Sequence, residues 1–156
     1  MCIRFLPLLS LLLLIGCAST PTAPQSELGK LQGDWQLVYE QMDGMKVPNE
    51  EAARMFHGRM NFTGDNVVYA ADLPGFYFEY KCKVDATSEP GTIDLKTLRI
   101  GYKHSRDTDK YLGSTTLGIY RRNGNYLLLC WNDDRRPTNF LATTENGNTL
   151  VVLKRK

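Results

Sequence analysis

The chain has 156 residues, of which 42% are hydrophobic and 10% aromatic, and its formal charge is +2 from 19 Lys and Arg against 17 Asp and Glu. This composition excludes a disordered chain, a collagen-like repeat, a coiled coil and a multi-span membrane protein. Charges of both signs are mixed along the chain, so it also lacks the concentrated basic surface of a nucleic-acid-binding protein.

The N-terminal segment is predicted to direct export. A short positive start, Met1–Arg4, precedes an apolar run, Phe5–Ile15, which is too short to span a bilayer but suits the core of a signal peptide. The run ends in Leu14-Ile15-Gly16-Cys17, which resembles the lipobox of bacterial lipoproteins. The resemblance implies cleavage after Gly16 and acylation of the Cys17 thiol, with palmitate among the chains. The alternative is an ordinary secretory signal with an incidental cysteine.

The resemblance also implies a location. Ala18, and not the Asp associated with inner-membrane retention, follows Cys17, which favours the outer membrane facing the periplasm. Several acyl chains on one residue hold a protein on a membrane effectively permanently. We therefore expect a signal peptide at 1–16, a lipidated cysteine with a Pro-containing tether at 17–27, and a folded domain at 28–156.

Alternation with a period of two predicts that the folded domain is all-β. The clearest segment is 76–85, where one face carries only apolar and aromatic residues: Phe76, Phe78, Tyr80, Cys82 and Val84. The same alternation sets Trp35, Leu37 and Tyr39 against a second face that includes Val38 and Glu40. Further strands are expected around Met60–Phe62, Ile93–Leu95, 117–121, 126–131, 138–143 and 150–154.

Turn-forming residues such as Asp43-Gly44 and Asn123-Gly124 separate these segments, and their spacing gives about eight to ten strands. Such a meander must close or form a sandwich to protect its edges. One short helix is expected near 49–57, with Asn49 as its N-cap and Gly58 at its end. The polar segment 103–114 is expected to be a long loop at a barrel mouth.

Several short motifs resemble one protein family. Gly33-Asp34-Trp35 is similar to the Gly-x-Trp signature of lipocalins, in which the Trp plugs the closed end of an eight-stranded barrel. The segments that follow it in order include Pro90–Leu95, Gly118-Ile119-Tyr120, Arg136–Phe140 and Leu153-Lys154-Arg155. Together, residues 28–156 resemble a family of small lipocalin-like bacterial domains of unknown function that is abundant in planctomycetes. The resemblance implies a calycin-type antiparallel β-barrel and no particular ligand, and Cys82 is not part of the family's pattern.

Two cysteines lie within the domain, and their state is open. In an oxidising periplasm, a Cys82–Cys130 disulfide would close a long loop and contribute about 4 kcal/mol on the chain-entropy model. The alternative is two buried, unpaired thiols that pack as small apolar residues.

No motif indicates catalysis, a cofactor or a metal. His57 and His104 lack partners at metal-binding spacing, and Asp107-Thr108-Asp109 lacks the further oxygen ligands of an EF-hand. We therefore expect a protein that is not an enzyme and that has no cofactor.

Two functions remain open, both in the cell envelope with the membrane as partner through Cys17. In the first, the barrel binds a small apolar or amphipathic ligand in a cavity lined by Trp35, Phe76, Phe78 and Tyr80. Alternatively, bulky inward side chains fill the barrel, which then acts as an envelope protein-interaction module.

Overall fold

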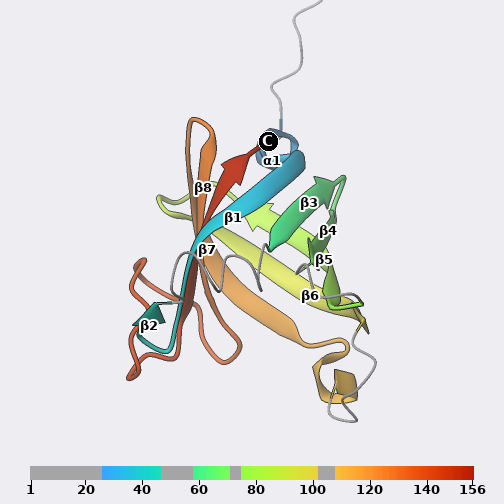
Figure 1. Ribbon diagram of the computed structural model, residues 1–156. Helices are drawn as coiled ribbons and strands as arrows, with labels where there is room; N and C mark the ends of the chain where they lie inside the picture. The colour runs from blue at the N-terminus through green and yellow to red at the C-terminus, as the bar shows by residue number, and fades with distance from the viewer. Residues whose placement is uncertain (1–25, 47–57, 71–74, 102–107) are drawn as a thin grey trace, which may run out of the picture.

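The computed structural model describes residues 26–46, 58–70, 75–101 and 108–156. They form an antiparallel β-structure with one short α-helix and one 3₁₀ turn, shown in Figure 1. The elements, in chain order, are α1 (Glu27–Leu31), β1 (Gly33–Met42), β2 (Met45–Lys46), β3 (Arg59–Thr63), β4 (Asn66–Ala70), β5 (Tyr77–Asp85), β6 (Gly91–Gly101), η1 (Thr108–Tyr111), β7 (Thr115–Asn123), β8 (Tyr126–Asn132) and β9 (Thr149–Arg155). Within these ranges, no helix is long and apolar enough to cross a membrane.

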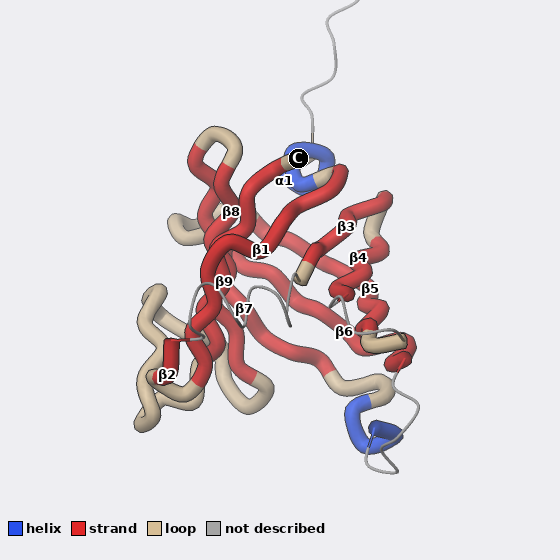
Figure 2. The backbone as a smooth tube through the Cα atoms, viewed as in Figure 1, coloured by secondary structure: helices blue, strands red, loops and turns tan. Residues whose placement is uncertain are grey.

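The sheet closes on itself. From β3 to β9 each strand pairs with the next in the chain, and β1 pairs with both β3 and β9. Every strand of the nine-stranded sheet except β2 therefore belongs to a closed eight-stranded barrel, whose wall Figure 2 traces. Closure leaves no free edge. The all-β class predicted from the alternation and the turns is confirmed, and the closed barrel is consistent with the lipocalin-like barrel that the resemblance implies.

Most of the predicted strands are confirmed, but the one expected around 138–143 is wrong, since this segment contains no strand. Asparagine side chains take the place of a strand partner here. The Asn139 side chain accepts from the Leu141 N–H, the Asn146 side chain accepts from the Thr143 N–H, and Asn148 donates to the Leu141 carbonyl. Such local bonds satisfy the backbone without a sheet.

The predicted helix at 49–57 lies outside the described residues, as does 103–107 of the predicted loop. The rest of that loop contains η1, after which Ser114 leads into β7.

A β-bulge in β1 corrects the predicted facing of its second half. Leu37 pairs with Leu153 and Tyr39 with Val152, so Val38 is an extra residue without a cross-strand partner on β9. Beyond the bulge the alternation is reversed. Tyr39, expected beside Trp35 and Leu37, faces outward, where its hydroxyl donates to Gln41. Glu40, expected outside, pairs with the fully buried Val151 and faces the interior.

The barrel end next to α1 is packed solid. Trp35 is completely buried there, and its indole N–H donates to the Leu31 carbonyl oxygen at 2.7 Å. The guanidinium of Arg155, from the end of β9, lies 4.4 Å from the centroid of the Trp35 ring. It also donates to the carbonyl oxygens of Gln32 and Lys30, at 2.8 and 2.6 Å, and so ties the last strand to the helix. Large apolar side chains complete this core: Leu31, Met60, Phe62, Val67, Leu127, Leu129 and Leu153.

The Cys82–Cys130 disulfide considered above is not formed, because both cysteines are free and buried. Cys82 pairs with Leu95 and belongs to the interior core. Cys130 alternates with the inward-facing Leu129 and lies on the outer side, with its thiol 3.9 Å from the Leu141 carbonyl. Strands β6 and β7 separate the two. The alternative of two buried, unpaired thiols describes the structure.

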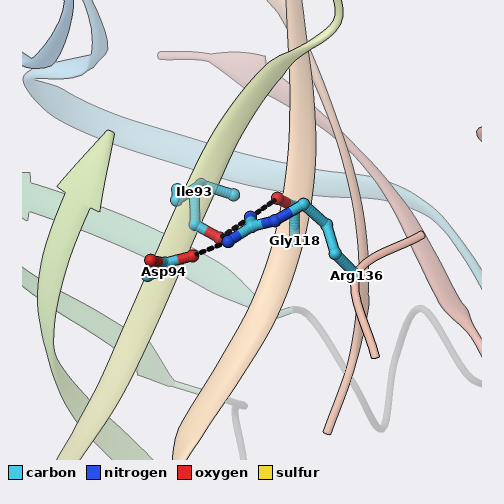
Figure 3. Close-up of polar contacts among 4 residues, drawn as sticks. All are labelled: Ile93, Asp94, Gly118 and Arg136. Atoms are coloured by element: carbon cyan, nitrogen blue, oxygen red, sulfur yellow. Dashed lines mark hydrogen bonds and ion pairs between the residues drawn. The ribbon is translucent and has the colours of Figure 1, made fainter. Parts of the chain in front are cut away.

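The long connection from β8 to β9, residues 133–148, is fixed to the outer wall of the barrel by Arg136. Its guanidinium pairs with the Asp94 carboxylate and donates to the carbonyl oxygens of Gly118 and Ile93 (Figure 3). One arginine thus connects this segment to both β6 and β7, and the segment covers Cys130.

Candidate ligand-binding cavity

A cavity of about 540 Å³ lies in the barrel half opposite α1. Its walls come mainly from the second half of β1, the first part of β5, the middle of β6 and the adjacent ends of β7, β8 and β9, and single residues of β2, β3, β4 and η1 complete them. Ligand pockets typically enclose about 300–1,000 Å³, and an eight-stranded barrel is just wide enough for one small ligand. The cavity is therefore of the right size for a single small molecule.

The cavity exists because the inward residues change size along the barrel. In the half near α1 they are large, and Phe62, Leu129 and Leu153 fill the space. In the other half, three strands contribute threonines to the cavity wall: Thr97, Thr116 and Thr149. Short inward side chains leave volume that larger side chains would fill.

A second bulge helps to shape this half. Tyr80 pairs with Thr97 and Glu79 with Arg99, so Leu98 is an extra residue in β6. Thr97 faces the interior and is only 4% exposed, whereas Leu98 is 41% exposed on the outside. Both bulged strands therefore contribute a cavity residue close to the bulge. Glu40 follows the bulge of β1, and Thr97 precedes the bulge of β6.

Aromatic side chains dominate one wall. Phe76, immediately before β5, and Phe78 and Tyr80 within β5 all line the cavity. The Phe76 and Phe78 rings meet edge to face at 5.3 Å, and the Phe78 and Tyr80 rings stack at 5.9 Å. Tyr69 from β4, paired with Phe78, and Trp131 from β8 extend this surface.

Three of the four residues predicted to line a ligand cavity do so: Phe76, Phe78 and Tyr80. Trp35, the fourth, lies in the solid core beside α1 and is not among the lining residues. That these aromatic residues bind a ligand stays a prediction. Sequence reasoning missed Glu40, because the bulge reverses the alternation, and Trp131, because the run Leu127–Trp131 is apolar on both faces.

Two carboxylates lie in this mainly apolar wall. Asp133 accepts a hydrogen bond from the Thr116 hydroxyl at 2.7 Å. Within the described part of the chain, no hydrogen bond or ion pair reaches the Glu40 carboxylate, and burial raises its pKa. No lysine, arginine or histidine occurs among the described lining residues.

The phenols in the wall are neutral donors over the whole physiological pH range. Burial, followed by the nearby Glu40 charge, raises the pKa of Tyr69, and burial and Asp133 raise the pKa of Tyr80. The described residues contain no group of three or more His, Cys, Asp or Glu that could hold a metal ion. The arrangement therefore offers an apolar, aromatic surface with hydrogen-bond donors and two acidic groups.

The chain matches no protein-family model and no curated protein.

Proposed function

We propose that this domain binds a small apolar or amphipathic molecule inside its barrel. The observation that carries the proposal is the cavity of about 540 Å³, walled by Phe76, Phe78, Tyr80, Tyr69 and Trp131, in a barrel whose other half is packed solid. Concave, mostly apolar pockets with a few polar groups are the usual form of small-molecule sites. The alternative, an interaction module with a filled barrel, has less support because the open half of this barrel is not filled.

We also propose that the barrel belongs to a membrane-anchored lipoprotein of the bacterial cell envelope, held by acyl chains on Cys17 and facing the periplasm. The support is the sequence Leu14-Ile15-Gly16-Cys17 after a short apolar run. The motifs quoted above favour membership of the small lipocalin-like bacterial domains. A tethered barrel with an apolar interior suits a carrier of amphipathic molecules that are present near membranes.

The binding proposal is tested with residues 18–156, which contain every strand of the closed barrel. N-Phenyl-1-naphthylamine, a neutral apolar probe, should gain fluorescence when it enters the cavity. Thr97→Phe places a large ring on the interior side of β6 and should abolish the gain. Thr115→Phe makes the same substitution at an exposed position of β7 and is the matched control. Equal probe binding by all three proteins would contradict a binding site inside the barrel.

The anchor is tested separately. The Cys17→Ser variant should be released from the membrane fraction, and the wild-type chain should incorporate labelled palmitate. Unchanged membrane association of the variant would contradict lipidation at this residue.

A further inference from the structure

The charged side chains among the described lining residues of the cavity all have the same sign of charge. Glu40 and Asp133 both line it, and no described lining residue has a basic side chain. Because Glu40 is partly buried, its carboxylate attracts positive charge and repels negative charge more strongly than it would in water, and the exposed Asp133 adds a weaker effect of the same sign. The described part of the wall therefore favours a positively charged ligand over a negatively charged one.

Glu40 is placed in the cavity by a specific backbone feature. Without the extra residue Val38, the alternation of β1 would direct the Glu40 carboxylate to solvent, where it would stay hydrated and have no desolvation penalty. Instead the carboxylate faces the interior, because Glu40 pairs with the fully buried Val151 on the neighbouring strand β9. No hydrogen-bond donor of the described residues reaches it. A partly buried carboxylate without a partner is unfavourable in the empty protein and becomes favourable when a cation pairs with it.

Aromatic faces supply the second element of a cation site. Tyr69 and Tyr80 line the same cavity as the two carboxylates, whose charges add to the effect of burial in raising the pKa of both phenols. Aromatic rings attract organic cations through their negative faces, and the attraction increases when the cation is desolvated. The Glu40 carboxylate and the rings of Tyr69, Phe76 and Phe78 thus line one cavity.

We infer that the ligand of this cavity is an organic cation, namely an amphipathic amine or quaternary ammonium compound, with its charged nitrogen beside Glu40 and Tyr69 and its apolar part against Phe76 and Phe78. The inference rests on the proposed function, because it names the class of ligand for the same cavity. Anionic amphiphiles such as fatty acids should bind more weakly, since no basic side chain among the described lining residues would pair with their carboxylate and Glu40 would repel it.

The test compares three probes with the same ten-carbon chain on residues 18–156: decyltrimethylammonium, decanol and decanoate. Isothermal titration calorimetry below the micellar concentration gives the three dissociation constants. We expect decyltrimethylammonium to bind at least about tenfold more tightly than decanol, and decanoate to bind most weakly. Glu40→Gln should weaken binding of the cation by about tenfold to a hundredfold, the range for hydrogen bonds and pairs with charged groups, and should change decanol binding less than about threefold.

Glu145→Gln, an exposed glutamate outside the cavity, is the matched control and should alter none of the three constants. Equal binding of decanol and decyltrimethylammonium, unaffected by Glu40→Gln, would overturn the inference and leave the proposed function intact. Tightest binding of decanoate would overturn it in the same way. If none of the probes binds, decanol included, the proposed function itself fails, and the inference fails with it.

Discussion

Arg155 holds the closed end of the barrel together, and its removal gives the sharpest stability prediction. In Arg155→Ala the protein loses two charged hydrogen bonds, to the Gln32 and Lys30 carbonyl oxygens, and the stacking of the guanidinium on Trp35. Because Arg155 is half-buried, each bond contributes about 1 kcal/mol, less than the fully buried value. The cation–π contact adds about 0.5–2 kcal/mol. The free energy of unfolding should therefore fall by about 2–4 kcal/mol, which lowers Tm by about 8–15 °C for a domain of this size.

Equilibrium urea unfolding, followed by tryptophan fluorescence, measures this loss, with an unchanged m-value as evidence that only stability changed. Arg155→Lys is the matched control. It keeps the charge, but an ammonium cannot stack on Trp35 and donate to two carbonyl groups in a fixed fork, so it should recover less than half of the loss. A loss below about 0.5 kcal/mol, or full recovery by lysine, would refute the role assigned to the guanidinium geometry.

Three further predictions concern the cavity acid, the thiols and the outer connection. Burial raises the pKa of Glu40, so folding favours its protonated form. In the empty protein at pH 7, Glu40→Gln should therefore unfold at a higher urea concentration than the wild type. This difference in urea midpoint should shrink as the pH falls through the raised pKa and vanish below the ordinary value of 4.5. Thermal or urea midpoints at several pH values check this, and a gap that widens toward acid pH would contradict it. Burial also raises the pKa of the Cys130 thiol to about 11 and that of the Cys82 thiol to about 12. A thiol reagent at pH 8 should therefore modify neither cysteine in the native protein and both cysteines in urea. Fewer than two reactive thiols after unfolding would indicate a disulfide. Arg136→Ala removes a half-buried ion pair with Asp94 and two hydrogen bonds to backbone, so we expect about 1–2 kcal/mol of lost stability and faster amide exchange in 133–148; unchanged exchange there would contradict its anchoring role.

The sequence predicts the barrel well because its strands obey a local rule. In β5, every second residue from Phe78 to Val84 faces the interior, as the alternation requires. The same rule fails in β1, since nothing local marks Val38 as a bulge. The bulge is defined by its pairing with β9, more than a hundred residues away in the chain, and it alone decides that Glu40 lies inside.

Which of the two alternatives holds, an open or a filled barrel, could not be decided from the sequence for a related reason. The open half depends on Thr97, Thr116 and Thr149 all lining the same cavity, and this follows from the pairing of strands that are distant in sequence. The facing of Trp131 likewise becomes definite only through its pairing with Thr149 and Gly118. The strand predicted at 138–143 is absent because asparagine side chains there accept hydrogen bonds from backbone N–H groups that a neighbouring strand would otherwise pair with.

The most direct test of the central claim, that the open half of the barrel holds a small molecule, is native mass spectrometry of residues 18–156 exported to a periplasm without the lipid. We predict an additional mass on the order of a few hundred daltons, as a molecule filling such a cavity would have, that is lost on organic extraction and absent from Thr97→Phe. A clean apo mass for the wild-type domain, together with no binding of N-phenyl-1-naphthylamine, would contradict the claim.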